Sequence, residues 1–443
     1  MRERNTWIDW DTPGRRTSQG QRNDTRSWKR VPNVDDARVI LDDVMAQGHL
    51  PKSDYADIDI TPFAHGYSNV LFLVHCKDWD FQTTLLRIAM PYDPWYQTES
   101  EVASMMKAAQ AGLPVPACIM FDSSGENELG LEWMLLEKID ARSLEAVYTK
   151  ELCGNQPHIF DPKGTAGHRV LQEVATYSRT LESTPFQHIG SLYFNWERTR
   201  FHIGPIVDED FLAEDTYPHS EGLRGPYHSV EEYLNCLAEV KSKAALDYIF
   251  ENRNIRGPDK PRRKLAGEFL GLVNNVTSGL VTALNKVYHA QAPRGDGPFH
   301  GSWAYFQHED LHVGNILVGD NPGDESMVKG IVDWGGCRVM PHFMRKSHGV
   351  PKINEVFLEE NFPRADIFNA STFEAYDLTK RCFAHRPVAR ELAPQDEHVS
   401  VATMVLNLWY RQVKKSDPRV EVDSRPIIAL ENFVDCFVRS GCQ

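Results

Sequence analysis

The sequence lacks any C-x-x-C pair and any cysteine spacing typical of a zinc site; its eight cysteines are dispersed along the chain. Dispersed cysteines favour reduced thiols in an intracellular compartment. No run approaches the ~18 apolar residues of a membrane span, and the N-terminus has no apolar segment typical of a secretory signal. We therefore expect a soluble, cytoplasmic protein. A mitochondrial presequence is the alternative, against which the four acidic residues among residues 1–30 argue.

Basic residues are also in the minority. The 443-residue chain carries 62 acidic and 48 basic side chains, a formal net charge of −14. This balance argues against nucleic-acid binding and tolerates cationic partners. Neither G-x-G-x-x-G nor a Walker-type G-K-[ST] occurs, so the common glycine-rich phosphate-binding loops are excluded.

What is present indicates an α+β protein with three regions. Residues 1–31 have little apolar periodicity and are expected to be a flexible extension. Residues 32–138 combine short β-rich runs in an antiparallel meander with one main helix, after a first helix capped by Asn33. Residues 139–443 are mainly helical in pattern, with two short strands, "GNILVG" and "KGIVDW", joined by a polar turn.

Those two strands carry the main chemical signal. His308, Asp310 and Asn315 match the pattern H-x-D-x-x-x-x-N, and Asp333 follows eighteen residues after Asn315. Phosphoryl transfer needs a carboxylate that orients the attacking hydroxyl and oxygen ligands that hold magnesium on the phosphates. The spacing therefore predicts Asp310 as catalytic base and Asn315 and Asp333 as magnesium ligands. His308 is expected to brace the loop backbone.

The two motifs "HEDLHVGN" and "IVDWGG" resemble those of the aminoglycoside phosphotransferase and choline kinase-like family, which includes long fungal-type members. The resemblance extends over roughly residues 58–345. It implies a bilobal protein kinase-like fold, with residues 32–138 as the nucleotide-binding N-lobe and residues 139–443 as the C-lobe. It further implies ATP and Mg²⁺ as cofactors, and transfer of the γ-phosphoryl group to a hydroxyl of a small molecule.

Carried to the N-lobe, the resemblance assigns the nucleotide-binding residues. Arg87 would take the place of the strand lysine that pairs with the phosphates, and its partner would be Glu101, with Glu99 as the alternative because the helix phase is uncertain. The remaining expected cofactor-binding residues are the tip of the phosphate loop and the segment that links the lobes: Gly66, Tyr67, Ser68, Asn69, Glu137 and Ile139.

Three other readings stay open on the sequence alone. His308, Asp310 and His312 form H-x-D-x-H, which could bind zinc in a metallohydrolase, although that reading leaves Asn315 and Asp333 unused. The chain could be a nucleotide-binding pseudokinase that acts as a scaffold. It could also act on a protein-bound acceptor such as a glycated lysine. Acidic residues in the C-lobe suit an amine-bearing acceptor, but the sequence identifies neither the acceptor nor the oligomeric state.

Overall fold

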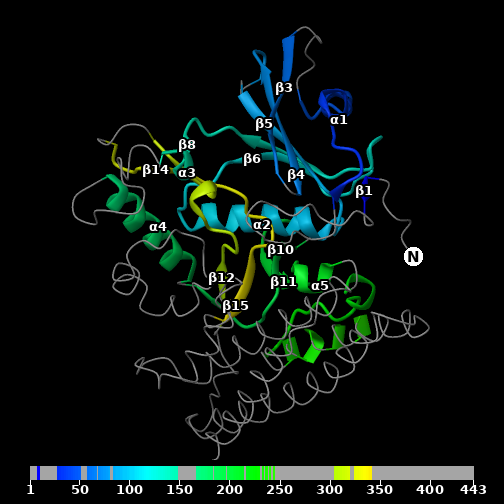
Figure 1. The fold of residues 1–443 in the computed structure, drawn as a ribbon, viewed down its shortest axis with the longest axis vertical. Helices are drawn as coiled ribbons and strands as arrows, with labels where there is room; N and C mark the ends of the chain where they lie inside the picture. The colour runs from blue at the N-terminus through cyan, green and yellow to red at the C-terminus, as the bar shows by residue number, and fades with distance from the viewer. Residues whose placement is uncertain are drawn as a thin grey trace, which may run out of the picture.

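The structure is a computed structural model that describes residues 7–9, 27–50, 57–147, 166–244 and 304–341, with short gaps inside the last three ranges. The expected helix at residues 265–289 and the C-terminal acidic residues lie outside these ranges. In the described part, a sheet region lies above a second region of helices and short strands, and one long helix runs between them (Figure 1).

The upper region is built on a five-stranded antiparallel sheet of strand order β3-β4-β5-β7-β6. Its strands are β3 (Ile58–His65), β4 (Asn69–Cys76), β5 (Thr83–Ala89), β6 (Cys118–Asp122) and β7 (Trp133–Glu137). Alternation of buried and more exposed residues along β4 matches the period of two expected for strands with one core-facing side. The meander predicted from the sequence is present.

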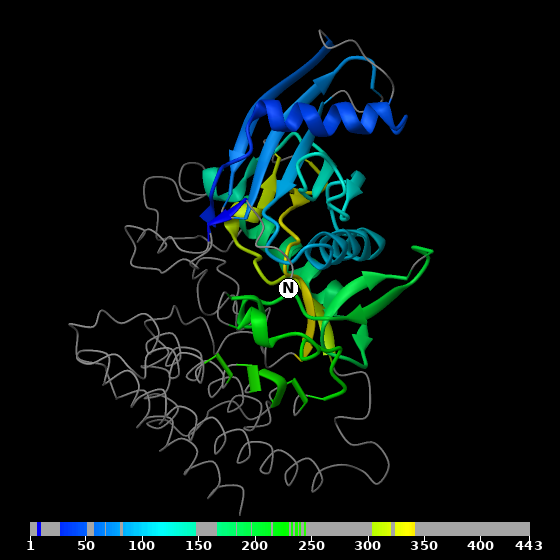
Figure 2. The same cartoon turned by 90° about the vertical axis from the view of Figure 1, so that its right-hand side faces the viewer.

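Helix α1 (Val34–Ala46) covers one face of this sheet, as the side view shows (Figure 2). Asn33 and Asp36 form a capping box at its start: the Asn33 side chain accepts from Asp36 N, and Asp36 accepts from Asn33 N. Its buried residues Ile40, Leu41 and Val44 recur at helical spacing and join a core with the sheet.

The described part of the N-terminal extension is ordered against the same core. Strands β1 (Ile8–Asp9) and β2 (Ser27–Trp28) pair, the ring of Trp7 meets that of Trp28 edge-on, and Trp7 Nε1 donates to Leu129 O at 2.8 Å. Trp7 is buried in the α1–sheet core. These residues of the extension thus contact the core, because a tryptophan pair supplies apolar area that the low overall periodicity conceals.

Helix α2 (Tyr96–Gln110) lies between the sheet and the lower region (Figure 1). Its buried residues Val102, Ala103 and Met105 belong to a second, larger core shared with strands of the lower region. The position of α2 is thus set by packing from both sides.

The lower region contains more strand than the sequence pattern predicts. Its helices include α3 (Leu144–Val147), α4 (Ala166–Glu182), α5 (Glu209–Leu212) and the 3₁₀ turns η3 (Tyr217–His219) and η4 (Val313–Asn315), and the described residues between 232 and 244 are also helical. Its strands are β8 (Arg142–Ser143), β9 (Pro185–Phe186), β10 (Ser191–Phe194), β11 (Phe201–Gly204), β12 (Ala304–Gln307), β13 (Ile316–Val318), β14 (Val328–Ile331) and β15 (Arg338–Pro341). The expected strands β13 and β14 and the helix α4 are present, whereas a mainly helical C-lobe is not established by the described residues.

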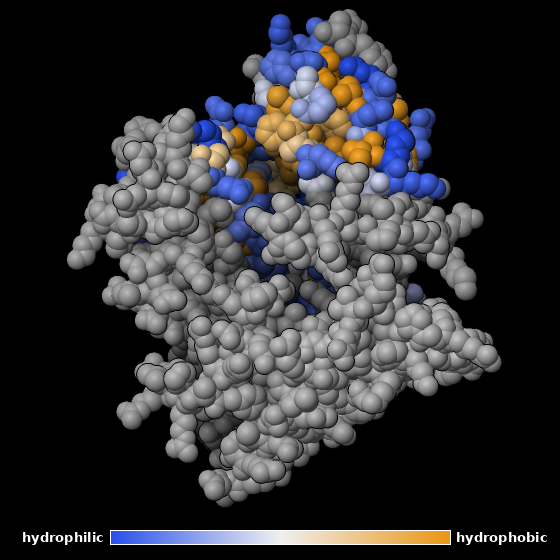
Figure 3. All heavy atoms as spheres, viewed as in Figure 1, coloured by the Kyte–Doolittle hydropathy of each residue, from blue (hydrophilic) through white to orange (hydrophobic). Residues whose placement is uncertain are grey.

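The view in Figure 3 shows apolar and charged side chains interspersed over the described upper region. In the described ranges, no helix combines the length and the apolar character needed to cross a membrane.

Candidate active site

The site begins where β12 ends, at a buried histidine. His308 Nε2 lies 3.1 Å from Val332 O, and His308 Nδ1 accepts from Asp310 N at 3.2 Å, so the ring proton is assigned to Nε2. Burial lowers the pKa of His308 below its ordinary value, and the ring is neutral. The ring also packs edge-on against Trp334, with centroids 4.6 Å apart. His308 therefore joins the backbone of the loop to that of the segment carrying Asp333.

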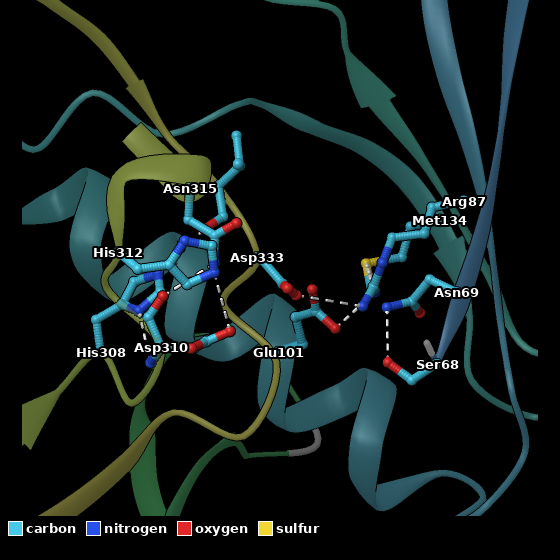
Figure 4. Close-up of polar contacts among 11 residues, drawn as sticks. Ser68, Asn69, Arg87, Glu101, Met134, His308, Asp310, His312, Asn315 and Asp333 are labelled. Atoms are coloured by element: carbon cyan, nitrogen blue, oxygen red, sulfur yellow. Dashed lines mark hydrogen bonds and ion pairs between the residues drawn. The ribbon is translucent and has the colours of Figure 1, made fainter. Parts of the chain in front are cut away.

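Asp310 and Asn315 lie on the loop between β12 and β13 (Figure 4). Asn315 Nδ2 donates to Asp310 O at 2.9 Å, and Asn315 N donates to His312 O at 2.9 Å. With its nitrogen engaged, the amide keeps Oδ1 as the atom that can bind a cation. The Asp310 carboxylate is 62% exposed, as a group that meets a substrate must be.

Asp333 follows β14 in a left-handed conformation, with φ of 62°. Aspartate tolerates this region better than most residues with a side chain. The turn beyond it is held by Trp334, whose Nε1 donates to Ile331 O at 2.8 Å. Gly335 lies so close that a Cβ there would be 3.4 Å from Glu101 Oε2 and 3.6 Å from Asp333 Oδ1. Gly335 thus lies in van der Waals reach of both carboxylates and of the guanidinium that they approach.

That guanidinium belongs to Arg87, on β5. Arg87 Nη1 donates to Glu101 Oε2 of α2 at 2.6 Å, and Arg87 Nη2 lies 4.0 Å from Asp333 Oδ1 (Figure 4). Arg87 and Glu101 are both buried. Burial raises the pKa of Glu101 to about 6, and the charge of Arg87 opposes that rise.

The alternative partner, Glu99, points elsewhere. Its Oε1 accepts from Ser123 Oγ at 2.7 Å and lies 3.7 Å from Arg198 Nη2. Of the two carboxylates considered for Arg87, only Glu101 contacts it, since Glu99 lies on a different side of α2.

The expected phosphate loop is the turn between β3 and β4. Gly66 N donates to Asn69 O at 2.9 Å, and Met90 N donates to Ser68 O at 2.8 Å, so the turn is closed and tied to the end of β5. Because Leu71 pairs with Arg87 and lies two residues after Asn69, the side chains of Asn69 and Arg87 project from the same face of the sheet. Tyr67 lies outside the described residues.

The expected linker residues follow directly after the sheet. Glu137 ends β7, and its backbone N–H donates to Ala117 O at 2.9 Å, while its side chain accepts from Ala117 N. Ile139 packs over Gly330 of β14, where a Cβ would lie 2.5 Å from Ile139 Cδ1. The linker is therefore attached to both regions, although the Glu137 N–H is already engaged.

The zinc reading gains no support from this geometry. Both ring nitrogens of His308 are engaged by backbone groups, Nε2 with Val332 O and Nδ1 with Asp310 N, so neither is available to a metal ion. Among the described residues, no group of three or more His, Cys, Asp or Glu side chains is placed to hold a metal ion.

Sequence reasoning considered His312 only as a possible zinc ligand and did not predict two contacts of the site. His312 lies beside Asp310, with Nε2 3.5 Å from Asp310 Oδ2, and its hydrogen bond with Asp310 raises its pKa. Buried Arg338 lies between Asp208 and Glu309, contacting Glu309 Oε2 at 2.7 Å, and so anchors the loop residue next to Asp310. His312 could have been found from its place in the motif, whereas nothing local connects Asp208 with Arg338.

Comparison with known proteins adds a family relationship. Residues 59–213 match the phosphotransferase enzyme family; this segment includes Arg87 and Glu101 and ends before the catalytic-loop motif. A subtelomeric hrmA-associated cluster protein, found in two strains of Aspergillus fumigatus, is 25% identical over 332 residues, which cover 67% of this chain. The chain matches 61% of the length of these curated relatives.

Three of the solved structures that match the chain have low sequence identity to it. An ethanolamine kinase of Plasmodium vivax has 13% identity and a TM-score of 0.41, covering 93% of this chain and 92% of its own. A thermostable mutant of aminoglycoside phosphotransferase APH(4)-Ia has 13% identity and a TM-score of 0.37, covering 88% and 97%. A putative fructosamine-3-kinase of Haemophilus somnus has 11% identity and a TM-score of 0.39, covering 86% and 91%. The expected family resemblance is confirmed over residues 59–213, which match the phosphotransferase enzyme family and do not include the catalytic-loop motif.

Proposed function

We propose that this protein is an ATP- and Mg²⁺-dependent phosphotransferase that moves the γ-phosphoryl group of ATP to a hydroxyl of a small molecule. The observation that carries the proposal is the convergence of three chain segments. The Arg87–Glu101 pair of the upper region lies 4.0 Å from Asp333, whose segment is joined through His308 to the loop bearing Asp310. Phosphoryl transfer needs these three kinds of group: a cation that binds the phosphates, oxygen ligands that hold the metal, and an exposed carboxylate that orients the acceptor.

The donor set fits magnesium. Asn315 presents an amide oxygen, because its nitrogen is engaged by Asp310 O, and Asp333 presents a partly exposed carboxylate. Hard oxygen ligands, few in number, are typical of magnesium held together with substrate phosphates. When bound, the ion would neutralise charge on the β- and γ-phosphate oxygens.

The protein groups would then perform positioning. Arg87 would bind phosphate oxygens, and Glu101 would hold the orientation of its guanidinium. Asp310 would accept the acceptor O–H as a hydrogen bond and take the proton as the new O–P bond forms and the bond to the β-phosphate oxygen breaks. In a largely dissociative transition state, alignment and charge stabilisation supply most of the acceleration.

The turn at Asn69 supports the phosphate-binding role. Asn69 is buried, its Nδ2 donates to Ser68 Oγ at 3.1 Å, and its Oδ1 has no hydrogen-bond partner among the described residues. Since the two ends of an amide are assigned from hydrogen bonding, a 180° rotation would let Oδ1 accept from Ser68 and turn the NH₂ group outward as a donor. A phosphate oxygen would satisfy that donor.

The acceptor is proposed to be a small hydroxylated molecule, with an amine-bearing one fitting the net charge of −14. The first experiment is a thermal-shift titration with ATP, with and without Mg²⁺, on the wild type, Asp333→Ala and the control Asp59→Ala, which removes an exposed carboxylate on β3. A Mg²⁺-dependent stabilisation present in the wild type and control but lost in Asp333→Ala supports the site.

ADP release would follow with ethanolamine, hygromycin B and a fructosylated lysine as acceptors. Turnover of any of these supports phosphotransfer. Nucleotide binding without turnover for any acceptor would favour a nucleotide-binding scaffold, and no binding at all would refute the proposal.

A further inference from the structure

His312 is fixed at one ring nitrogen by the loop itself. It is the N-cap of η4, where its Nδ1 accepts from Gly314 N at 2.9 Å. Gly314 is needed for this approach, because a Cβ there would lie 2.6 Å from His312 Cε1 and 2.9 Å from Nδ1. The contact is built into the loop and does not depend on a bound ligand.

Occupation of one nitrogen determines the role of the other. Because Nδ1 acts as acceptor, a neutral ring carries its proton on Nε2. That N–H faces Asp310, with Nε2 3.5 Å from Oδ2 (Figure 4). Catalytic hydrogen bonds are often long before substrates bind and shorten in the reacting complex.

A donor in this position can orient the Asp310 carboxylate. This carboxylate is 62% exposed, so packing alone does not select one orientation, whereas His308 below it holds only the backbone of the loop. A donor on Oδ2 would direct Oδ1 toward the acceptor hydroxyl. In the proposed reaction the proton leaves that hydroxyl late, so orientation of Asp310 matters more than its basicity.

We infer that His312 is a positioning residue that donates through Nε2–H to Asp310 and so holds its carboxylate in line for the acceptor hydroxyl; this inference rests on the proposed function. The two histidines of the motif then have separate tasks. His308 holds the backbone at Asp310, and His312 holds the side chain.

Two substitutions separate the two nitrogens of His312. His312→Asn keeps an acceptor for Gly314 N but does not reach Asp310, while His312→Gln places an NH₂ group near the former Nε2 and loses the cap. For His312→Asn we expect kcat of ADP release to fall at least about tenfold, with KM for Mg-ATP within about twofold. His312→Gln is expected to recover to within about threefold of the wild type despite its weaker cap.

The reverse order, with His312→Asn active and His312→Gln inactive, would show that the cap alone matters and overturn the inference. Equal activity of His312→Asn and wild type would overturn it as well.

A spectroscopic arm keeps this inference distinct from the proposed function. In long-range ¹H–¹⁵N spectra of ¹⁵N-histidine-labelled protein, the signal lost in His312→Asn should show the Nε2–H tautomer and should shift in Asp310→Ala. A signal that shows the Nδ1–H tautomer, or that does not change in Asp310→Ala, would refute the contact. If the wild type turns over no acceptor, the proposed function fails, and these spectra still decide whether His312 holds Asp310.

Discussion

Arg87→Met removes the positive charge that lowers the pKa of Glu101, and the effect on stability can be worked out from linkage. In the wild type, burial raises the pKa of Glu101 to about 6 while Arg87, 2.6 Å away, opposes the rise. Without Arg87 the pKa should rise further, because Glu101 stays buried and Asp333 adds a like charge; buried glutamates without a partner reach pKa values of about 8–9. The variant should therefore fold with Glu101 protonated at pH 7.

The sign of the stability effect follows directly. When the pKa of a carboxyl is higher in the folded than in the unfolded state, the free energy of unfolding of the protein falls as pH rises from the unfolded-state pKa to the folded-state pKa. In the wild type the loss ends near pH 6, whereas in Arg87→Met it continues to the higher pKa at about 1.4 kcal/mol per pH unit. If that pKa reaches about 8, the variant should lose about 2 kcal/mol more than the wild type between pH 6 and pH 8, because each carboxyl is only half titrated at its own pKa.

The assay is urea unfolding at pH 6, 7 and 8, followed by circular dichroism. Arg87→Met/Glu101→Leu is the matched control. Without the carboxyl the extra pH dependence should disappear. Nucleotide binding should be lost in both variants, because both lack Arg87. Arg198→Met tests removal of a more exposed guanidinium, 3.7 Å from Glu99, and should cost less than about 1 kcal/mol. A pH-independent difference between Arg87→Met and the wild type would refute the reasoning.

Two further predictions concern turnover and the N-terminal ribbon. Asp310→Asn should keep Mg-ATP binding in the thermal-shift assay and lose about 10²–10⁴-fold in kcat, since the acceptor proton loses its base; unchanged ADP release would contradict the assignment. Trp7→Ala should destabilise the protein by about 3 kcal/mol, because it removes a buried ring and its hydrogen bond to Leu129 O, measured by urea unfolding. ADP release at 25 °C should persist in that variant, and its loss would mean that the ribbon supports the active site.

Short-range patterns predicted much of this molecule. The helix at Val34–Ala46 is marked by its cap and its apolar spacing, and the strands around the catalytic loop by β-branched runs between turn residues. The partner of Arg87 could be either Glu99 or Glu101, because the sequence alone does not show which side of α2 faces Arg87. The structure resolves that choice through packing of Val102 and Met105 in the lower core.

Long-range pairing accounts for what the sequence did not predict. Strand β12 pairs with β9, more than a hundred residues earlier in the chain, and with β15, about thirty residues later, and each partner is too short to show a period of two. The burial of Trp7 was not predicted, because the residue lies in a segment of polar composition. One buried tryptophan nevertheless contributes more packing energy than many solvated neighbours. The Asp208–Arg338–Glu309 cluster likewise joins residues that only the fold brings together.

The position of α2 explains why residue spacing alone predicts only one part of the candidate site. Asp310 and Asn315 precede β13, Asp333 follows β14, and these two strands pair, so one local motif specifies all three residues. Arg87 projects from the sheet, whereas Glu101 is carried by a helix whose buried residues belong to the core of the lower region. The helix is also held by Asp93, just before it, which contacts Arg224 of the lower region at 2.6 Å. The arginine proposed to bind phosphate is therefore oriented by packing in the region that bears the proposed catalytic base, which couples the two halves of the site through α2.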